Sequence, residues 1–134
     1  MTASTTQSTD LTGRMIIAGV PVFGAGTQIH GIDPGTGENL EPAYGHGDDS
    51  DVERACAAAA DAFADYRATS SDTRARFLET IADNIAALGD TLIERTVAES
   101  GLPLARITGE VGRTTGQLRL FASVLREGSW NGAR

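Results

Sequence analysis

The feature that most restricts the fold is a run of helical apolar spacing that begins at Ser50 and continues almost to the end of the chain. Apolar residues there recur every three or four positions, as on one face of an α-helix. The spacing predicts helices over 50–66, 71–88, 90–100 and 104–127. Before Ser50, glycine and turn residues separate short apolar runs, which predict an irregular β-ribbon over 14–44. The expected fold class is therefore mainly α with an N-terminal β-ribbon.

Individual residues set the expected ends of the helices and the faces that they bury. Ser50 and Glu53 have the spacing of a capping box, in which two side chains satisfy each other's backbone N–H groups. Asp90 is expected to cap the third helix, which Gly101-Leu102-Pro103 ends. In the first helix the stripe expected to be buried consists of Val52, Cys56, Ala59, Phe63 and Tyr66.

Within the predicted ribbon, the run from Met15 to Phe23 indicates two short strands about a turn at residues 18–21. Pro21 cannot donate a backbone hydrogen bond, so its strand is expected at an edge. Residues 28–33 and 40–44 are candidates for two further strands.

The predicted helix over 104–127 carries two distinct faces. Gly109, Gly112 and Gly116 lie on one of them, and each costs the helix roughly 1 kcal/mol relative to alanine. That cost predicts that another backbone or a ligand approaches this face closely. The other face is an apolar seam made of Ile107, Val111, Thr114, Leu118, Phe121 and Leu125.

Two arginines on this helix invite different interpretations. Arg113 shares the glycine face, and from spacing alone a solvated or salt-bridged side chain is the simpler interpretation. Arg119 lies next to the apolar seam and is a candidate for a structural ion pair.

The composition narrows the range of partners. The 134 residues carry a net charge of −7, and every basic residue is arginine. An acidic chain lacks the clustered cations that nucleic acids and anionic membranes attract, so neither is expected as a partner. Apolar residues make up 40% of the chain, but alanine supplies many of them. Burying alanine removes little surface from water, so the stability of the chain alone is expected to be modest.

Cysteine use and the N-terminus bear on the compartment. The single cysteine, Cys56, cannot form an internal disulfide, which fits a reducing environment. Residues 1–12 are expected to form a disordered tail, since they combine threonine and serine without the basic start or apolar run of a signal peptide. A cytoplasmic protein is expected.

Three patterns that could carry chemistry lack the required spacing. Gly24-Ala25-Gly26 and Gly45-His46-Gly47 each lack the third glycine of a dinucleotide fingerprint, so they are interpreted as turn glycines. His30 and His46 have no metal-ligand spacing to each other or to Cys56.

Two further candidates have simpler structural interpretations. The acidic residues Asp48, Asp49 and Asp51 lack the spacing of a calcium loop and suit the start of a helix. Cys56 is interpreted as a small buried hydrophobe in mid-helix rather than as a nucleophile.

Five segments of the chain form a recognisable series: Ile32 to Glu38, Ser50 to Arg67, Arg74 to Ile85, Glu99 to Pro103, and Gly109 to Ala122. In their amino-acid sequences and in their order along the chain they resemble the N-terminal part of the aldehyde dehydrogenases, and the resemblance covers roughly Gly13 to Arg134. The last segment is most similar to a subgroup that oxidises 2,5-dioxovalerate (α-ketoglutaric semialdehyde), alongside related fatty-aldehyde enzymes that use NADP.

The resemblance implies that residues 13–134 form the N-terminal portion of the family's α/β fold, incomplete at the C-terminus. That portion comprises the ribbon and the helices over 50–127, without the Rossmann-like core strands and the catalytic domain. The implied reaction converts an aldehyde to a carboxylate with NADP or NAD in the complete enzyme. No residue of this sequence matches the family's nucleophilic cysteine or its general-base glutamate. The chain is therefore expected to contain no catalytic, cofactor-binding or metal-binding residue, and to be inactive and without bound cofactor when alone.

Two functions stay open: a fragment whose partner is the remainder of an aldehyde dehydrogenase chain, and a stand-alone helical interaction module. A fragment should leave Leu118, Phe121 and Leu125 largely uncovered and should self-associate, whereas a module should bury them.

By resemblance, the helix over 104–127 borders the family's substrate tunnel, with Gly109 and Arg113 on the tunnel side. A guanidinium there would suit an anionic aldehyde.

Overall fold

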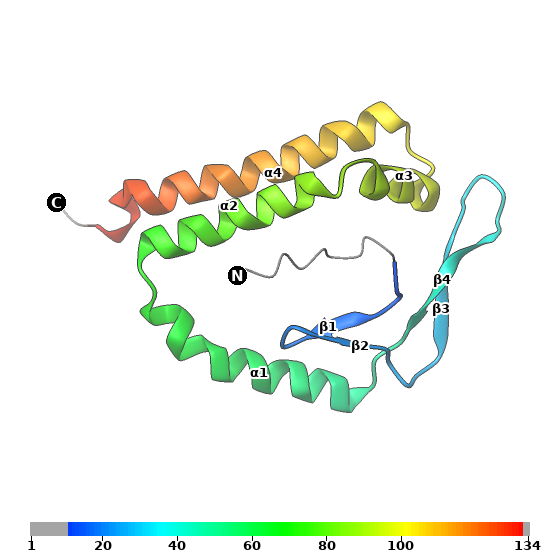
Figure 1. The fold of residues 1–134 in the computed structure, drawn as a ribbon, viewed down its shortest axis with the longest axis horizontal. Helices are drawn as coiled ribbons and strands as arrows, with labels where there is room; N and C mark the ends of the chain where they lie inside the picture. The colour runs from blue at the N-terminus through cyan, green and yellow to red at the C-terminus, as the bar shows by residue number, and fades with distance from the viewer. Residues whose placement is uncertain (1–10, 133–134) are drawn as a thin grey trace, which may run out of the picture.

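The computed structural model describes residues 11–132, and the tail predicted over residues 1–12 lies largely outside that range. Helices α2 and α4 run side by side with α3 at one end of the pair, and α1 lies on the opposite side of the molecule (Figure 1). The elements are, in order, β1 Met15–Ile17, β2 Val20–Val22, β3 Gln28–Ile32, β4 Asn39–Gly45, α1 Asp49–Ala68, α2 Ser71–Ala87, α3 Gly89–Ser100, α4 Leu104–Glu127 and the short 3-10 helix η1 Ser129–Asn131.

The four helices occur where the apolar spacing predicts them, but α1 begins with a different cap. Its N-cap is Asp48, whose side chain accepts the backbone N–H of Asp51 at 3.0 Å. Asp51 returns the interaction by accepting the N–H of Asp48 at 3.1 Å. The capping box predicted at Ser50 and Glu53 is therefore wrong. Ser50 instead donates its hydroxyl to Asp48 at 2.6 Å, which holds the capping carboxylate in place.

The prediction that Asp90 caps the third helix is also wrong. Helix α3 begins directly after Leu88, which ends α2 in a helical conformation, and no side chain caps it. Gly89 has a positive φ of 52°, so the chain turns between the two helices at the glycine itself. Asp90 falls inside the first turn of α3, where its charge favours the positive end of the helix dipole.

Small side chains form the contact between α2 and α4. Ala75 and Ala82 of α2 are fully buried, as is Ala122 of α4, with Ile107 and Thr115 almost so. The buried face of α4 overlaps the predicted seam, since Ile107 is buried and Val111, Leu118 and Leu125 are half-buried, whereas Phe121 at the edge of the seam is 53% exposed. Small residues at the contact let the two helix backbones approach closely, which leaves the larger apolar side chains at the edges of the interface.

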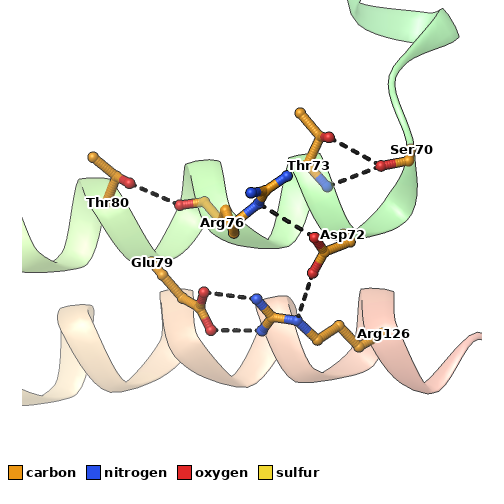
Figure 2. Close-up of polar contacts among 7 residues, drawn as sticks. All are labelled: Ser70, Asp72, Thr73, Arg76, Glu79, Thr80 and Arg126. Carbon is orange, nitrogen blue, oxygen red and sulfur yellow. Dashed lines mark hydrogen bonds and ion pairs between the residues drawn. The ribbon is translucent and has the colours of Figure 1, made fainter.

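Ion pairs join the same two helices along their polar edge. Arg126 of α4 donates to both carboxylate oxygens of Glu79, at 2.6 and 2.8 Å, and to Asp72 at 3.2 Å (Figure 2). Arg119 binds Asp83 at 2.8 Å, so the ion pair predicted for Arg119 is confirmed.

The N-terminal ribbon consists of two separate antiparallel hairpins. Strands β1 and β2 pair with Ile16 opposite Pro21, and β3 and β4 pair with Ile29 opposite Tyr44. The turn of the first hairpin contains only Ala18 and Gly19, both at positive φ, because Pro21 lies within β2 rather than in the predicted turn. Each hairpin needs other elements to pack against, and these are α1 for the first and α3 for the second.

Helix α1 presents to β1 a face that only partly overlaps the predicted stripe, since Val52 and Ala59 of that stripe line depressions beside β1. It packs on β1 through alanines, including Ala55, Ala58 and Ala62, which line a shallow depression with Ile16 and Ile17. Members of the predicted stripe, Val52, Phe63 and Tyr66 among them, are exposed. Cys56 is exposed as well, so the prediction that it is buried is wrong.

Candidate functional site

The face of α4 that points away from α2 carries Arg113, the one polar residue that the sequence proposes for a substrate path. Arg113 lies six residues after the buried Ile107 and two residues before the buried Thr115, on the opposite side of the helix, and its side chain is 74% exposed. Its Nε donates to Oε2 of Glu110 at 2.7 Å. No other hydrogen bond or ion pair involves Arg113 in the part of the chain that the structure describes.

Glu110 connects two arginines. Its Oε1 accepts from Arg106, with distances of 3.0 Å to Nε and 2.9 Å to the terminal nitrogen, while its Oε2 accepts from Arg113. The hydrogen bond from Arg113 is the main cause that lowers the pKa of Glu110, and the hydrogen bond from Arg106 lowers it further. The cluster is a carboxylate held between two guanidinium groups, with one net positive charge.

The three glycines of α4 lie in open space. A Cβ added at Gly109, Gly112 or Gly116 would meet no atom within 4 Å among the described residues. The close approach that the sequence predicts at this face is therefore not made by any part of the chain between residues 11 and 132. Small residues and an unobstructed surface leave room there for another molecule or another segment.

Apolar side chains are exposed toward the end of α4. Leu120 and Val124 continue the surface of the glycines, and Phe121 lies at the edge of the seam beside α2. A groove of about 440 Å³ runs beside them and is lined by Arg74, Leu78, Leu118, Phe121, Val124, Leu125 and Trp130. A second groove of about 340 Å³ has Glu110 in its wall, together with Ile107, Val111 and Thr114 of the same helix and residues of α2 and α3.

The other sequence candidates are not assembled into a reactive site. Cys56 lies in the middle of α1, and no hydrogen bond or ion pair of residues 11–132 involves it. Nε2 of His30 lies 3.5 Å from Oε1 of Glu41 across the second hairpin. Among the described residues there is no cluster of three or more histidine, cysteine or acidic side chains that could hold a metal, and no helix long and apolar enough to cross a membrane.

The passage that precedes α1 does not fit the phosphates of a nicotinamide nucleotide. The place with the right chain order is the passage from β4 through His46 and Gly47 to the start of α1. There the capping carboxylates of Asp48 and Asp51 occupy the N–H groups that would bind a phosphate, and Asp49 adds negative charge. Gly24 and Gly26 of the neighbouring Gly-x-Gly pattern instead allow the chain to pass close to the carbonyl of His46.

Comparison of the sequence with known proteins shows the family to which the chain belongs. Residues 23–132 match the aldehyde dehydrogenase family. The chain belongs to that family. Its relatives include alpha-ketoglutaric semialdehyde dehydrogenase 2 of Azospirillum brasilense, which is 55% identical over 119 residues, or 88% of this chain and 23% of the relative. An alpha-ketoglutaric semialdehyde dehydrogenase of Acinetobacter baylyi is 51% identical over 84 residues, or 63% of this chain and 16% of the relative. The chain thus spans about a quarter or less of these relatives.

One feature of this aldehyde dehydrogenase segment goes beyond the residues singled out from the sequence. The exposure of Arg113 and its pair with Glu110 agree with the interpretation of a solvated or salt-bridged side chain, but Glu110 and Arg106 were not predicted as partners. The signal for this pairing is present in the sequence, because Arg106, Glu110 and Arg113 are spaced by four and then three residues, and such positions are neighbours on a helix.

Proposed function

We propose that this chain is the N-terminal segment of an NAD(P)-dependent aldehyde dehydrogenase that oxidises 2,5-dioxovalerate, or a related semialdehyde, to the carboxylate. Membership of the family and the names of both relatives support this reaction and this substrate class. Within that enzyme the segment contributes the wall of the substrate path rather than the reacting groups.

The single observation that carries the proposal is the outer face of α4. Arg113 is an exposed cation beside the open glycines of this surface, and its side chain is more exposed than that of Arg106 in the same cluster, at 74% against 66%. Gly109 and Gly112 leave space for a substrate chain, and the guanidinium can hold a carboxylate through two parallel charge-assisted hydrogen bonds. A small aldehyde with a carboxylate at its far end matches this arrangement better than an alkanal does.

The uncovered apolar surface favours a segment of a larger enzyme over a stand-alone module. A module would bury the residues of its long seam, whereas Phe121 is more than half exposed and Leu118 and Leu125 line an open groove. Exposed apolar area of this extent is typical of a surface that another part of a protein covers.

The experiment that tests the substrate uses a chimera in which residues 23–132 replace the matching segment of the Azospirillum brasilense relative. We expect Arg113→Met to raise KM for 2,5-dioxovalerate by roughly 10- to 150-fold, which corresponds to about 1.5–3 kcal/mol for a hydrogen bond to a charged group. KM for a neutral aldehyde of similar length should stay nearly unchanged. Arg119→Met serves as the matched control, because Arg119 pairs with Asp83 on the side of α2. Equal losses for both aldehydes would show that Arg113 supports the helix and not the substrate.

A second expectation concerns the 134 residues alone. We expect no formation of reduced nicotinamide cofactor when the purified chain is mixed with aldehyde and NAD or NADP, because the described residues provide neither a nucleotide site nor an activated thiol. Turnover that disappears in Cys56→Ser would contradict this expectation, whereas turnover unaffected by that substitution would indicate a contaminating enzyme.

A further inference from the structure

We propose that Glu110 is a positioning residue for substrate recognition, which fixes the Arg113 guanidinium by one edge and leaves the other edge available for the substrate carboxylate. This inference rests on the proposed function, since it concerns how Arg113 recognises an anionic aldehyde. It adds a residue that neither the sequence pattern nor the names of the relatives assign.

The first step is the geometry of the contact between Arg113 and Glu110. A guanidinium has five N–H donors, one on Nε and four on the two terminal nitrogens. Glu110 takes the Nε donor at 2.7 Å, and no described residue accepts from the terminal nitrogens of Arg113. The edge formed by the two terminal nitrogens is the one that binds a carboxylate end-on with two parallel hydrogen bonds. Glu110 therefore holds Arg113 without competing for that edge.

The second step is what holds Glu110 itself. Arg106 donates from Nε to Oε1 and its terminal nitrogen lies 2.9 Å from the same oxygen, so the carboxylate is bound through both of its oxygens by two different side chains. Glu110 is also the least exposed of the three, at 32% against 66% for Arg106 and 74% for Arg113. The less mobile carboxylate thus serves as the fixed point, and the exposed guanidinium of Arg113 is ordered by it.

The third step is the energetic consequence. A long arginine side chain that is free in solution must be ordered when it binds a substrate, and a fixed one has already lost that freedom. Loss of Glu110 should therefore weaken binding of the anionic aldehyde. Simple electrostatics predicts the opposite, because removing a carboxylate raises the positive charge beside the substrate path. The two explanations differ in sign and can be separated.

The test compares three substitutions in the chimera, each assayed with 2,5-dioxovalerate and with a neutral aldehyde. Glu110→Ala should raise KM for 2,5-dioxovalerate about two- to fivefold, with kcat and the neutral aldehyde nearly unaffected. Glu110→Asp keeps the charge but is one methylene shorter, so it should show a similar rise. Glu110→Gln keeps the reach and the acceptor oxygen without the charge, and it should restore most of the wild-type KM.

The background and the control make the outcome decisive. In Arg113→Met, adding Glu110→Ala should have no further effect on either substrate, since there is no guanidinium left to position. Glu53→Ala, on the exposed face of α1, is the control for loss of a surface carboxylate.

A KM that falls in Glu110→Ala and Glu110→Gln but not in Glu110→Asp would overturn the inference in favour of a purely electrostatic role. Unchanged KM values in all three, with Arg113→Met behaving as expected, would overturn it while leaving the proposed function intact. If Arg113→Met changes KM equally for the anionic and the neutral aldehyde, both the inference about Glu110 and the proposed role of Arg113 are contradicted.

Discussion

At the scale of single residues, Gly13 is the position where the backbone leaves least freedom. Its φ is +64°, and a Cβ built there would lie 1.8 Å from the carbonyl oxygen of Ala43. Gly19 provides a matched comparison, with a φ of +78° and no atom within 4 Å of its Cβ position. Gly19→Ala should therefore cost only the left-handed conformation, about 1 kcal/mol, whereas Gly13→Ala should cost clearly more because the chain near Ala43 must move.

The measurement for this pair is thermal unfolding followed by circular dichroism. We expect the midpoint to fall in both variants and to fall further in Gly13→Ala. Equal midpoints in the two variants would mean that the segment around Gly13 does not pack against β4 in solution.

At single residues, the prediction of an ion pair for Arg119 is confirmed and the prediction of the cap of α1 is wrong. The ion pair of Arg119 follows from its place beside the seam, and it is present. The cap of α1 was placed two residues late, because Ser50 and Glu53 satisfy the same spacing rule as Asp48 and Asp51. The arginine–glutamate–arginine cluster on α4 had a local signal that was not used, and the role of Arg113 toward a substrate stays a prediction.

At the scale of elements, Arg126 links the end of α4 to the start of α2 (Figure 2). It binds Glu79 through two nitrogens and Asp72 through a third contact. Arg126→Met should lower the thermal midpoint of unfolding, because it removes contacts between two helices. Arg76→Met is the control, since Arg76 pairs with Asp72 only within α2, at 3.2 Å, and its loss should have a smaller effect. Equal midpoints for the two variants would count against the interhelical link.

The same link should depend on pH. The hydrogen bond from Arg126 lowers the pKa of Glu79 below its ordinary value of 4.5. A carboxyl group whose pKa is lower in the folded state stabilises the fold above its unfolded pKa, and this stabilisation is lost as the pH falls through the folded pKa. Wild-type protein should therefore lose more of its thermal stability than Arg126→Met between neutral pH and values below 4.5. Parallel pH profiles for the two proteins would show that the pair does not form.

Arg95 is the corresponding link between α3 and the second hairpin. Its side chain is 16% exposed and donates to Tyr44 at 3.3 Å and to the carbonyl of Glu41, while its guanidinium lies 5.9 Å from the Tyr44 ring centroid. We expect Arg95→Met to speed amide hydrogen exchange in β3 and β4, because the hairpin loses its anchor. Glu94→Ala removes a charge from an exposed position of the same helix and should leave exchange in the hairpin nearly unchanged.

The existence of the four helices could be predicted, but their buried faces could be predicted only in part. Glycine, proline and capping residues act on the chain locally, so the positions of the helices follow from the sequence alone. Which stripe of a helix is covered depends on the element that reaches it. Helix α1 packs on β1 through alanines, and α4 buries Ile107 of the predicted seam but meets α2 through Thr115 and Ala122 rather than through Phe121.

At the scale of the whole molecule, the described residues cover little of their own apolar surface. No large side chain among them is fully buried, and Phe63, Phe77 and Phe121 are each more than half exposed. The purified chain should therefore self-associate, or bind a hydrophobic dye as a loosely packed monomer. Sedimentation velocity together with dye fluorescence checks this. A monodisperse monomer with a sharp melt and no dye binding would favour the stand-alone module.

The central claim, that the outer face of α4 receives an anionic aldehyde, is tested most directly by a crystal structure of the chimera with the reaction product 2-oxoglutarate bound. We expect one carboxylate of the product to contact the terminal nitrogens of Arg113, with its carbon chain passing beside Gly109 and with Glu110 still on Nε. A product carboxylate held by residues outside this segment, with Arg113 directed away from the substrate path, would contradict the claim.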